Sequence, residues 1–260
     1  MSSPTIWSAG RYDALGERIA PIADEVVDAV AALLPLRGAA VVDVACGTGN
    51  AALAAAAAGA HVTGVDVTAE LVAIAERKAR AAGVSASWVT ADAADTGLPG
   101  GSFDAAVSNM GVIFVEPARV VAEVARLLRP GGALGFSSWV PDPANPFFRP
   151  IAEVLGPQKN SAHSPDQWGD PETVADRLAA DFDDLRIESR TLTWQLGTVE
   201  QAVDFVARES PLHVSVLGGV DEATRRRLLT AFGTVMRAHA GADGMVSYDS
   251  PYLVATALRR

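Results

Sequence analysis

Three aspartates in the first hundred residues have surroundings suited to holding a polar ligand. Asp43 lies in an apolar run that ends in a Gly-Thr-Gly turn at 47–49, and Asp66 and Asp92 each end a further run of mainly apolar residues. Carboxylates accept hydrogen bonds from hydroxyls and amines, and glycine lets a ligand approach the main chain closely. This chemistry favours a nucleoside-like ligand, and a carboxylate at Asp43 favours one that also carries an ammonium or sulfonium cation.

These aspartates require three buried strands to position them. Strands are predicted at 41–44, 61–66 and 87–92, with helices between them at 51–58 and 68–82. Strands that alternate with helices form a parallel sheet, and ligands bind outside the carboxyl ends of its strands. We therefore expect Asp66 to accept the ribose hydroxyls. Asp92 and the N–H of Ala93 are expected to contact the edge of an adenine.

The pattern continues to about residue 140 and then changes. Further strands are predicted at 103–109 and 133–139, and later ones at 185–195 and 252–258. The helical segment 11–34 is expected to divide at Pro21, because proline interrupts helical hydrogen bonding. The expected organisation is one compact α/β domain in three parts: an N-terminal helical lid at 1–36, a Rossmann-like core at 37–140, and the remaining strands with inserted helices at 141–260.

Four segments resemble motifs of the class I S-adenosylmethionine-dependent methyltransferases: the stretch from Asp43 to Gly49, Gly-Val-Asp at 64–66, Leu-Pro-Gly-Gly-Ser-Phe-Asp at 98–104, and Leu-Arg-Pro-Gly-Gly at 128–132. The similarity is closest to the small-molecule branch that includes the ubiquinone and menaquinone methyltransferases. It implies a doubly wound, mostly parallel seven-stranded sheet with an antiparallel last strand. The helices at about 196–245 would then form a substrate cap.

The resemblance also implies a cofactor and a set of residues. S-adenosyl-L-methionine would be the donor and S-adenosyl-L-homocysteine the product, with a small molecule methylated on oxygen, nitrogen or carbon. His213 and His163 are candidates for a general base, although a structural role is the alternative for each. The residues expected to bind the cofactor are Asp43, Ala45, Gly47, Gly49, Asp66, Val67, Asp92, Ala93 and Ser108.

Composition limits the partners. The formal net charge of −10 argues against nucleic acid or an anionic membrane surface, because binding phosphates requires a basic face. The single cysteine fits a reducing compartment, and no signal peptide or spanning segment is expected, so the sequence predicts a cytoplasmic monomer or homodimer. No cluster of His, Cys, Asp and Glu has metal-ligand spacing, so no metal is expected.

Two other functions remain open at the sequence level. A nicotinamide-dependent oxidoreductase would use a third glycine where Ala52 stands, but alanine is tolerated at that position. A protein that keeps the cofactor without transferring its methyl group would also retain Asp66 and Asp92.

Overall fold

The computed structural model describes residues 5–156 and 164–260. The strands are β1 Ala40–Val44, β2 His61–Asp66, β3 Ala86–Thr90, β4 Phe103–Asn109, β5 Leu128–Trp139, β6 Phe182–Thr198 and β7 Met245–Arg259. The helices are α1 Tyr12–Ala31, α2 Asn50–Ala57, α3 Ala69–Ala81, α4 Pro117–Leu127, α5 Arg149–Leu155, α6 Pro171–Leu178, α7 Val199–Asp204, α8 Pro211–Gly218 and α9 Glu222–Ala238.

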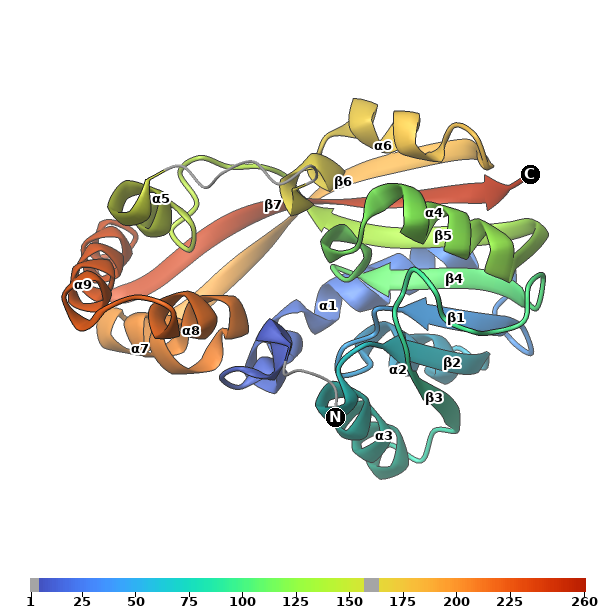
Figure 1. The fold of residues 1–260 in the computed structure, drawn as a ribbon, viewed down its shortest axis with the longest axis horizontal. Coiled ribbons are helices and arrows are strands. Elements are labelled where there is room, and N and C mark those ends of the chain that lie inside the picture. The colour runs from blue at the N-terminus through green and yellow to red at the C-terminus, as the bar shows by residue number, and fades with distance from the viewer. Residues whose placement is uncertain (1–4, 157–163) are drawn as a thin grey trace. The chain divides into compact units, whose positions relative to one another are not determined.

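The strands form one seven-stranded sheet in the order β3-β2-β1-β4-β5-β7-β6 (Figure 1). The first five strands pair in parallel, and β7 runs antiparallel to β5. From β1 the chain first adds β2 and β3 on one side of the sheet, and then returns to add β4 and β5 on the other side. This change of direction places helices on both faces, which is the doubly wound arrangement. The predicted Rossmann-like sheet with an antiparallel last strand is confirmed.

The chain divides into two compact units. The first comprises Met1–Arg18, Asp142–Ser161 and Thr191–Pro251, and the second comprises Ile19–Pro141, Ala162–Arg190 and Tyr252–Arg260. Strands β6 and β7 contribute residues to both units, and each is longer than the stretch that sequence alternation indicated. The second unit contains all of β1 to β5 and therefore every predicted cofactor residue.

Helix α1 is continuous, so the predicted break at Pro21 was wrong. Its apolar face packs on β5 at a glycine: a Cβ at Gly135 would lie 2.3 Å from a methyl carbon of Val30. The missing side chain lets the helix approach the strand closely. Burial of that face, with Ile22, Val26 and Val30 inaccessible to solvent, outweighs the backbone hydrogen bond that proline cannot donate.

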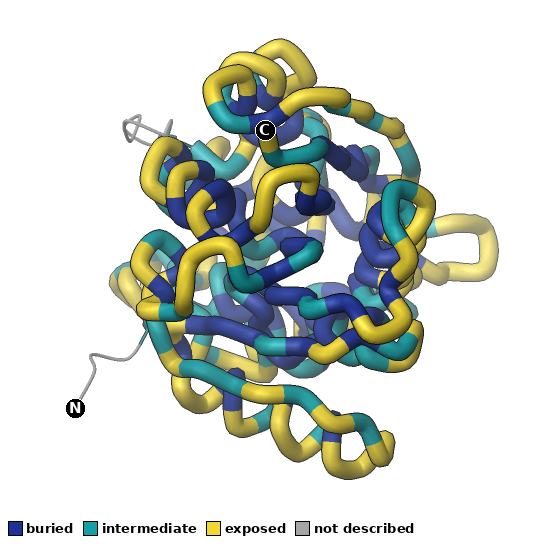
Figure 2. Tube along the Cα trace, turned by 90° about the vertical axis from the view of Figure 1, so that its right-hand side faces the viewer, coloured by how far each residue is buried: buried dark blue, intermediate teal, exposed yellow. Residues whose placement is uncertain are grey.

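Buried residues follow the strands and the inner faces of the helices (Figure 2). On the β2–β3 side, the ring of the half-buried Trp88 occupies space left by two glycines. A Cβ at Gly49 or Gly64 would lie 2.8 or 2.5 Å from that ring. The second glycine of the turn at 47–49 therefore has a packing role, besides its left-handed φ of 85°. The sequence analysis did not identify α5 and α8, which are short and begin at or next to prolines.

Candidate cofactor site

The carboxyl ends of β1, β2 and β3 lie side by side, and each is followed or ended by one of the predicted aspartates. Asp43 pairs in register with Gly64, and Asp66 pairs with Thr90. The N–H of Ala91, which precedes Asp92, donates to the carbonyl of Asp66 at 3.0 Å. Parallel pairing thus places the three predicted positions along one edge of the sheet.

Asp43 holds the start of the helix that follows the turn. Its Oδ2 accepts the N–H of Ala52 in the first turn of α2 at 2.8 Å. Gly49, the residue before that helix, has no side chain to cap it, so the carboxylate from β1 supplies the cap. The other oxygen, Oδ1, is buried and has no hydrogen-bond partner among residues 5–156 and 164–260. A buried carboxylate oxygen without a partner is costly, and an ammonium group would satisfy it.

Asp66 holds the loop after β1 and the start of α3. Its Oδ2 accepts the N–H of Gly47 and its Oδ1 accepts the N–H of Thr68, each at 2.8 Å. The carboxylate is 7 % exposed, whereas its neighbour Val67 is 50 % exposed. An exposed valine beside a carboxylate gives an apolar surface for a base next to a hydrogen-bonding group for a sugar.

Burial sets the charge state of this pair. It raises the pKa of Asp43 from 3.8 to about 8, with the negative charge of Asp66 adding to the shift and the hydrogen bond from Ala52 opposing it. Burial also raises the pKa of Asp66, against the lowering effect of its hydrogen bonds from Thr68 and Gly47. Desolvation disfavours the carboxylate form of both residues. A cationic ligand group would stabilise these carboxylates by direct electrostatic attraction.

The turn at 47–49 contains a further polar atom that the sequence analysis did not select. The hydroxyl of Thr48 is buried and has no hydrogen-bond partner in the part of the chain that the structure describes. Just before it, Ala45 has a φ of 55°, which is unusual for a residue with a Cβ. Strained backbone persists where the surrounding structure over-determines it and is typical of ligand sites. The signal in the sequence that could have identified this hydroxyl as a candidate ligand contact is the position of Thr48 between two glycines.

Asp92 lies in a loop rather than in β3, which ends at Thr90. Its Oδ1 accepts the N–H of Ala94 at 2.9 Å, and its Oδ2 is 3.7 Å from Nη2 of Arg119. The side chain is half exposed, while Ala93 is buried. The carboxylate therefore keeps contact with solvent at the edge where the adenine is expected.

The end of β4 is held by hydroxyl groups. Ser108 is fully buried, and its hydroxyl donates to the carbonyl of Val44 at 2.6 Å and accepts the N–H of Val112 at 3.1 Å. Its only donor is therefore used within the protein. A Cβ at Gly111 would lie 2.4 Å from the carbonyl oxygen of Ala45, so this glycine lets the loops after β1 and β4 touch.

Of the two candidate general bases, the structure describes His213 but not His163, which lies outside the described residues. His213 is 4 % exposed in α8, with Nδ1 2.7 Å from the Ser210 hydroxyl and Nε2 2.8 Å from the carbonyl oxygen of Phe147. Because that carbonyl only accepts, Nε2 carries the proton and Ser210 donates to Nδ1. Burial lowers the pKa of His213 to about 4, so the ring is neutral and both nitrogens are engaged.

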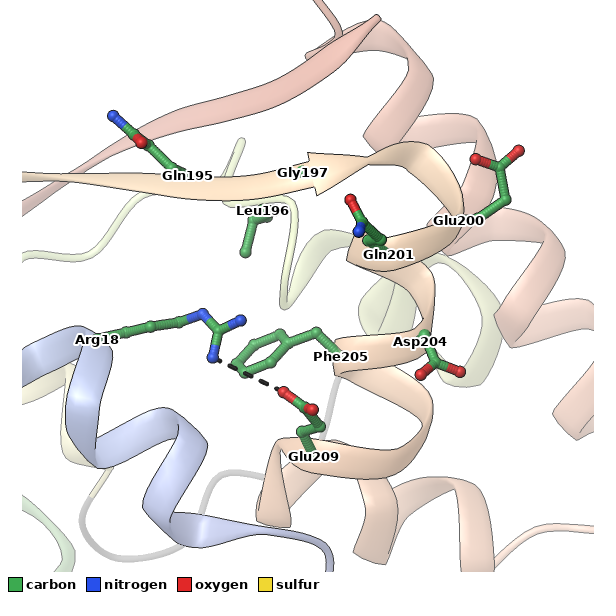
Figure 3. Close-up of a pocket in the computed structure, with 9 residues that line it drawn as sticks. All are labelled: Arg18, Gln195, Leu196, Gly197, Glu200, Gln201, Asp204, Phe205 and Glu209. Carbon is green, nitrogen blue, oxygen red and sulfur yellow. Dashed lines mark ion pairs between the residues drawn. The ribbon is translucent and has the colours of Figure 1, made fainter.

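The first unit contains a separate cavity of about 590 Å³ (Figure 3). The guanidinium of Arg18 lies 4.5 Å from the centre of the Phe205 ring and 3.7 Å from a carboxylate oxygen of Glu209. Leu196 also points toward this group, whereas Gln201 turns back to accept the N–H of Thr198, and Glu200 and Asp204 point away. The cavity combines an aromatic face with a cation and a carboxylate, and its size suits a small molecule.

The residues that the structure describes contain neither a metal-binding cluster nor a membrane-spanning helix. No group of three or more His, Cys, Asp and Glu side chains there is placed to hold a metal ion. Within 5–156 and 164–260, every helix is too short or too polar to cross a bilayer.

Comparison with known proteins places this geometry in a family. A methyltransferase domain profile matches residues 41–132. The chain is 32 % identical over 200 residues to nocamycin O-methyltransferase of Saccharothrix syringae, covering 68 % of this chain and 70 % of that protein. It is 35 % identical over 147 residues to demethylmenaquinone methyltransferase of Thermus thermophilus, covering 54 % and 66 % of the two chains.

Solved structures share the fold. Phosphoethanolamine N-methyltransferase 2 of Haemonchus contortus, solved with phosphomonomethylethanolamine and S-adenosylhomocysteine, has a TM-score of 0.55 at 15 % identity, over 90 % of this chain and 52 % of that chain. The 4+2 cyclase SpnF has a TM-score of 0.52 at 25 % identity, over 90 % of this chain and 80 % of that one.

Proposed function

Because the chain belongs to the class I S-adenosylmethionine-dependent methyltransferases, we propose that it methylates a small molecule whose accepting atom becomes nucleophilic by its own ionisation, such as a phenol or an enol. S-adenosylmethionine is the cofactor and supplies an electrophilic methyl group on a sulfonium. The observation that carries the proposal is the row of aspartates at the ends of β1 to β3, in which Asp43 keeps a buried oxygen without a partner.

Each of these residues has a proposed task. Asp43 neutralises the ammonium group of the methionine portion, and Asp66 accepts hydrogen bonds from the ribose hydroxyls. Val67 packs against the adenine, while Asp92 and the N–H of Ala93 bond its edge. The backbone at Ala45, Gly47 and Gly49 approaches the cofactor closely, and Ser108 acts indirectly, by fixing the loop after β4 through Val44 and Val112.

Orientation supplies most of the catalysis in this proposal. Holding the acceptor, the methyl carbon and the sulfur in line lowers the barrier by about 7–11 kcal/mol through orientation alone. His213 is neutral, and its one basic nitrogen, Nδ1, accepts the Ser210 hydroxyl, so this buried hydrogen bond would have to break before the ring could act as a base. An acceptor that ionises near neutral pH needs no such base, which favours phenols and enols over unactivated alcohols.

The cavity of the first unit supports an acceptor of small-molecule size. Arg18, whose guanidinium lies over the buried Phe205 ring, can pair with an anionic oxygen. Two named relatives, an O-methyltransferase and a demethylmenaquinone methyltransferase, are consistent with oxygen or carbon as the accepting atom. The acidic composition and the single cysteine support a cytoplasmic monomer or homodimer that does not bind nucleic acid.

The deciding experiment is methyl transfer from labelled S-adenosylmethionine to a panel of phenols, enols, quinone precursors and amines. We expect labelled product from phenols or enols, with a rate that rises through the pKa of the acceptor. Preference for amines, or a rate that ignores the acceptor's pKa, would contradict the proposal.

A second candidate is a protein that binds the cofactor without transferring its methyl group. The likeness to the SpnF cyclase at 25 % identity favours testing it. Binding of S-adenosylhomocysteine with no label transfer to any acceptor, and conversion of a polyene substrate to a ring, would support that alternative.

A further inference from the structure

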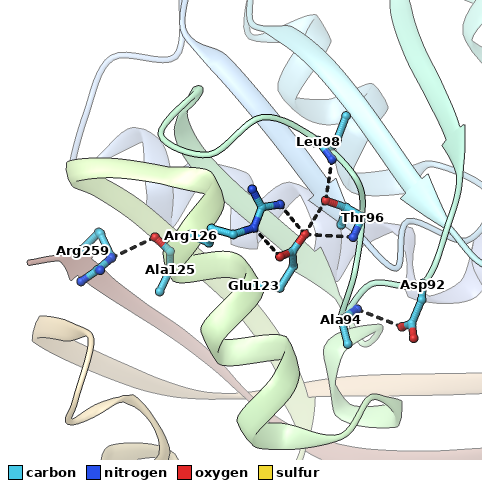
Figure 4. A network of polar contacts seen from close by, with 8 residues as sticks. All are labelled: Asp92, Ala94, Thr96, Leu98, Glu123, Ala125, Arg126 and Arg259. Carbon is cyan, nitrogen blue, oxygen red and sulfur yellow. Dashed lines mark hydrogen bonds and ion pairs between the residues drawn. The ribbon is translucent and has the colours of Figure 1, made fainter.

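Glu123 is a buried charged residue that the proposed chemistry does not use. It lies on α4 and is 7 % exposed. Its Oε1 accepts the N–H of Thr96 at 2.9 Å and the Thr96 hydroxyl at 2.5 Å. The guanidinium of Arg126 donates from Nε to Oε2 and from Nη2 to Oε1, each at 2.7 Å (Figure 4). A buried carboxylate with four donors is fully satisfied, so its position is well defined.

This network fixes the loop that follows β3. Thr96 lies four residues after Asp92, and its hydroxyl also accepts the N–H of Leu98 at 3.2 Å. Farther along, the N–H of Gly101 donates to the carbonyl of Arg126 at 2.9 Å. The last turn of α4 therefore holds the loop at two points. The pKa of Glu123 is lowered to about 2, chiefly by the hydrogen bonds from Arg126, so the network stays charged at neutral pH.

Because Thr96 is only four residues from Asp92, holding Thr96 in place also restricts the position of Asp92. Asp92 closes a tight turn by accepting the N–H of Ala94, and an isolated bridge pairs Asp92 with Asp95. Ala93 is buried between them. The segment from Asp92 to Thr96 is short, has hydrogen bonds of its own, and is held at Thr96 by Glu123. It therefore has few alternative conformations. Loss of the anchor at Thr96 would free the residues that face the base.

We propose that Glu123 is a positioning residue for base recognition: by holding Thr96 against α4 it fixes Asp92 and Ala93, and thereby sets the preference of the site for adenine. The proposal rests on the cofactor site described above.

The test compares two ligands that differ at the base edge. S-adenosylhomocysteine carries the adenine amine, and its deaminated analogue carries a carbonyl oxygen there. Calorimetry gives the dissociation constants of both ligands for wild type, Glu123→Gln, Thr96→Val and Asp92→Asn. Asp170→Ala is the matched control, because it removes a helix cap in the same unit, on α6, far along the chain from the loop. Melting temperatures accompany every variant.

We expect wild type to prefer the adenine ligand, and Glu123→Gln to reduce that preference about tenfold, the scale of one lost hydrogen bond to a charged group. Thr96→Val should reduce it in the same direction, and Asp170→Ala should lower only the melting temperature. Equal weakening of both ligands by Glu123→Gln would overturn the positioning role. If Asp92→Asn leaves the preference intact while S-adenosylhomocysteine still binds, the assignment of Asp92 is wrong and the proposal falls with it.

Discussion

At the scale of single residues, the candidate cofactor site contains buried polar atoms without hydrogen-bond partners among the described residues. Asp43 caps α2 with one oxygen and keeps the other buried without a partner. Desolvation makes its carboxylate form unfavourable until a cation arrives, so ligand binding and proton loss should be coupled.

That coupling gives a prediction for pH. The pKa of Asp43 is about 8 in the folded protein, against an ordinary value of 3.8. Between these values the folded protein keeps a proton that the unfolded chain releases. The contribution of Asp43 to the free energy of unfolding without ligand should therefore fall as pH rises from about 4 to 8, and the difference between wild type and Asp43→Asn in urea titrations should show this slope. Asp66 should contribute a slope of the same sign in both proteins, because its pKa is raised as well.

The same shift predicts proton release on cofactor binding. Calorimetry with S-adenosylhomocysteine at pH 7, in two buffers of different ionisation enthalpy, should show close to one proton released for wild type and almost none for Asp43→Asn. Asp28→Asn, on the exposed face of α1, is the control and should behave as wild type. Binding without proton release in wild type would mean that Asp43 does not meet the ammonium group.

Gly111 gives a second prediction at this scale. Gly111→Ala would push a methyl group to 2.4 Å from the carbonyl oxygen of Ala45, so the loops after β1 and β4 must separate. We expect a loss of stability of about 1–3 kcal/mol, as for other overpacked sites, and weaker binding of S-adenosylhomocysteine. Gly218→Ala, in open space on α8, should be neutral or slightly stabilising, and a variant at 111 that bound the cofactor normally would disprove the close contact.

At the scale of elements, a short helix and a loop are each held by hydrogen bonds to residues distant in the sequence. Helix α8 shows no amphipathic signal in its sequence, yet His213 ties it to the carbonyl of Phe147 and stacks near Phe148. The Thr96–Glu123 contact plays the corresponding part for the loop after β3. Such contacts join residues distant in sequence, so local patterns do not predict them.

Helix α8 should consequently be sensitive to acid. The pKa of His213 is about 4 in the folded protein against an ordinary 6.5, so in that interval the unfolded chain binds the proton first. The contribution of His213 to stability should be complete above about pH 6.5 and fall by up to about 3 kcal/mol as pH drops to 4, opposite in sign to the contribution of Asp43. Unfolding midpoints measured across this range should lose that dependence in His213→Gln. They should keep it in His61→Gln, which changes an exposed histidine.

At the scale of the whole molecule, membership of the methyltransferase family predicts that S-adenosylhomocysteine raises the free energy of unfolding. S-adenosylhomocysteine binds only the folded protein, so a hundredfold excess over its dissociation constant should stabilise the protein by about 2.7 kcal/mol and raise the melting temperature. NADH at the same concentration should leave the melting temperature unchanged. A rise with NADH alone would favour the oxidoreductase alternative.

The sequence by itself determined the sheet and the edge on which the cofactor residues stand. Apolar runs at 41–44, 61–66 and 103–109, separated by helical segments, correspond closely to β1, β2 and β4, because buried parallel strands need continuous apolar residues. Asp43 and Asp66 come from the same local pattern. Their role toward the cofactor stays a proposal, but their places at adjacent strand ends follow from parallel pairing alone.

Only the tertiary structure decided which polar atoms are paired. The Ser108 hydroxyl bonds Val44, Glu123 bonds Thr96, and Thr48 has no partner, although nothing in the spacing of these residues distinguishes them. It also decided that α1 continues through Pro21, since packing against β5 outweighs one backbone hydrogen bond. Periodicity reports which face of an element is apolar, whereas hydrogen-bond partners and burial depend on elements far apart in the chain.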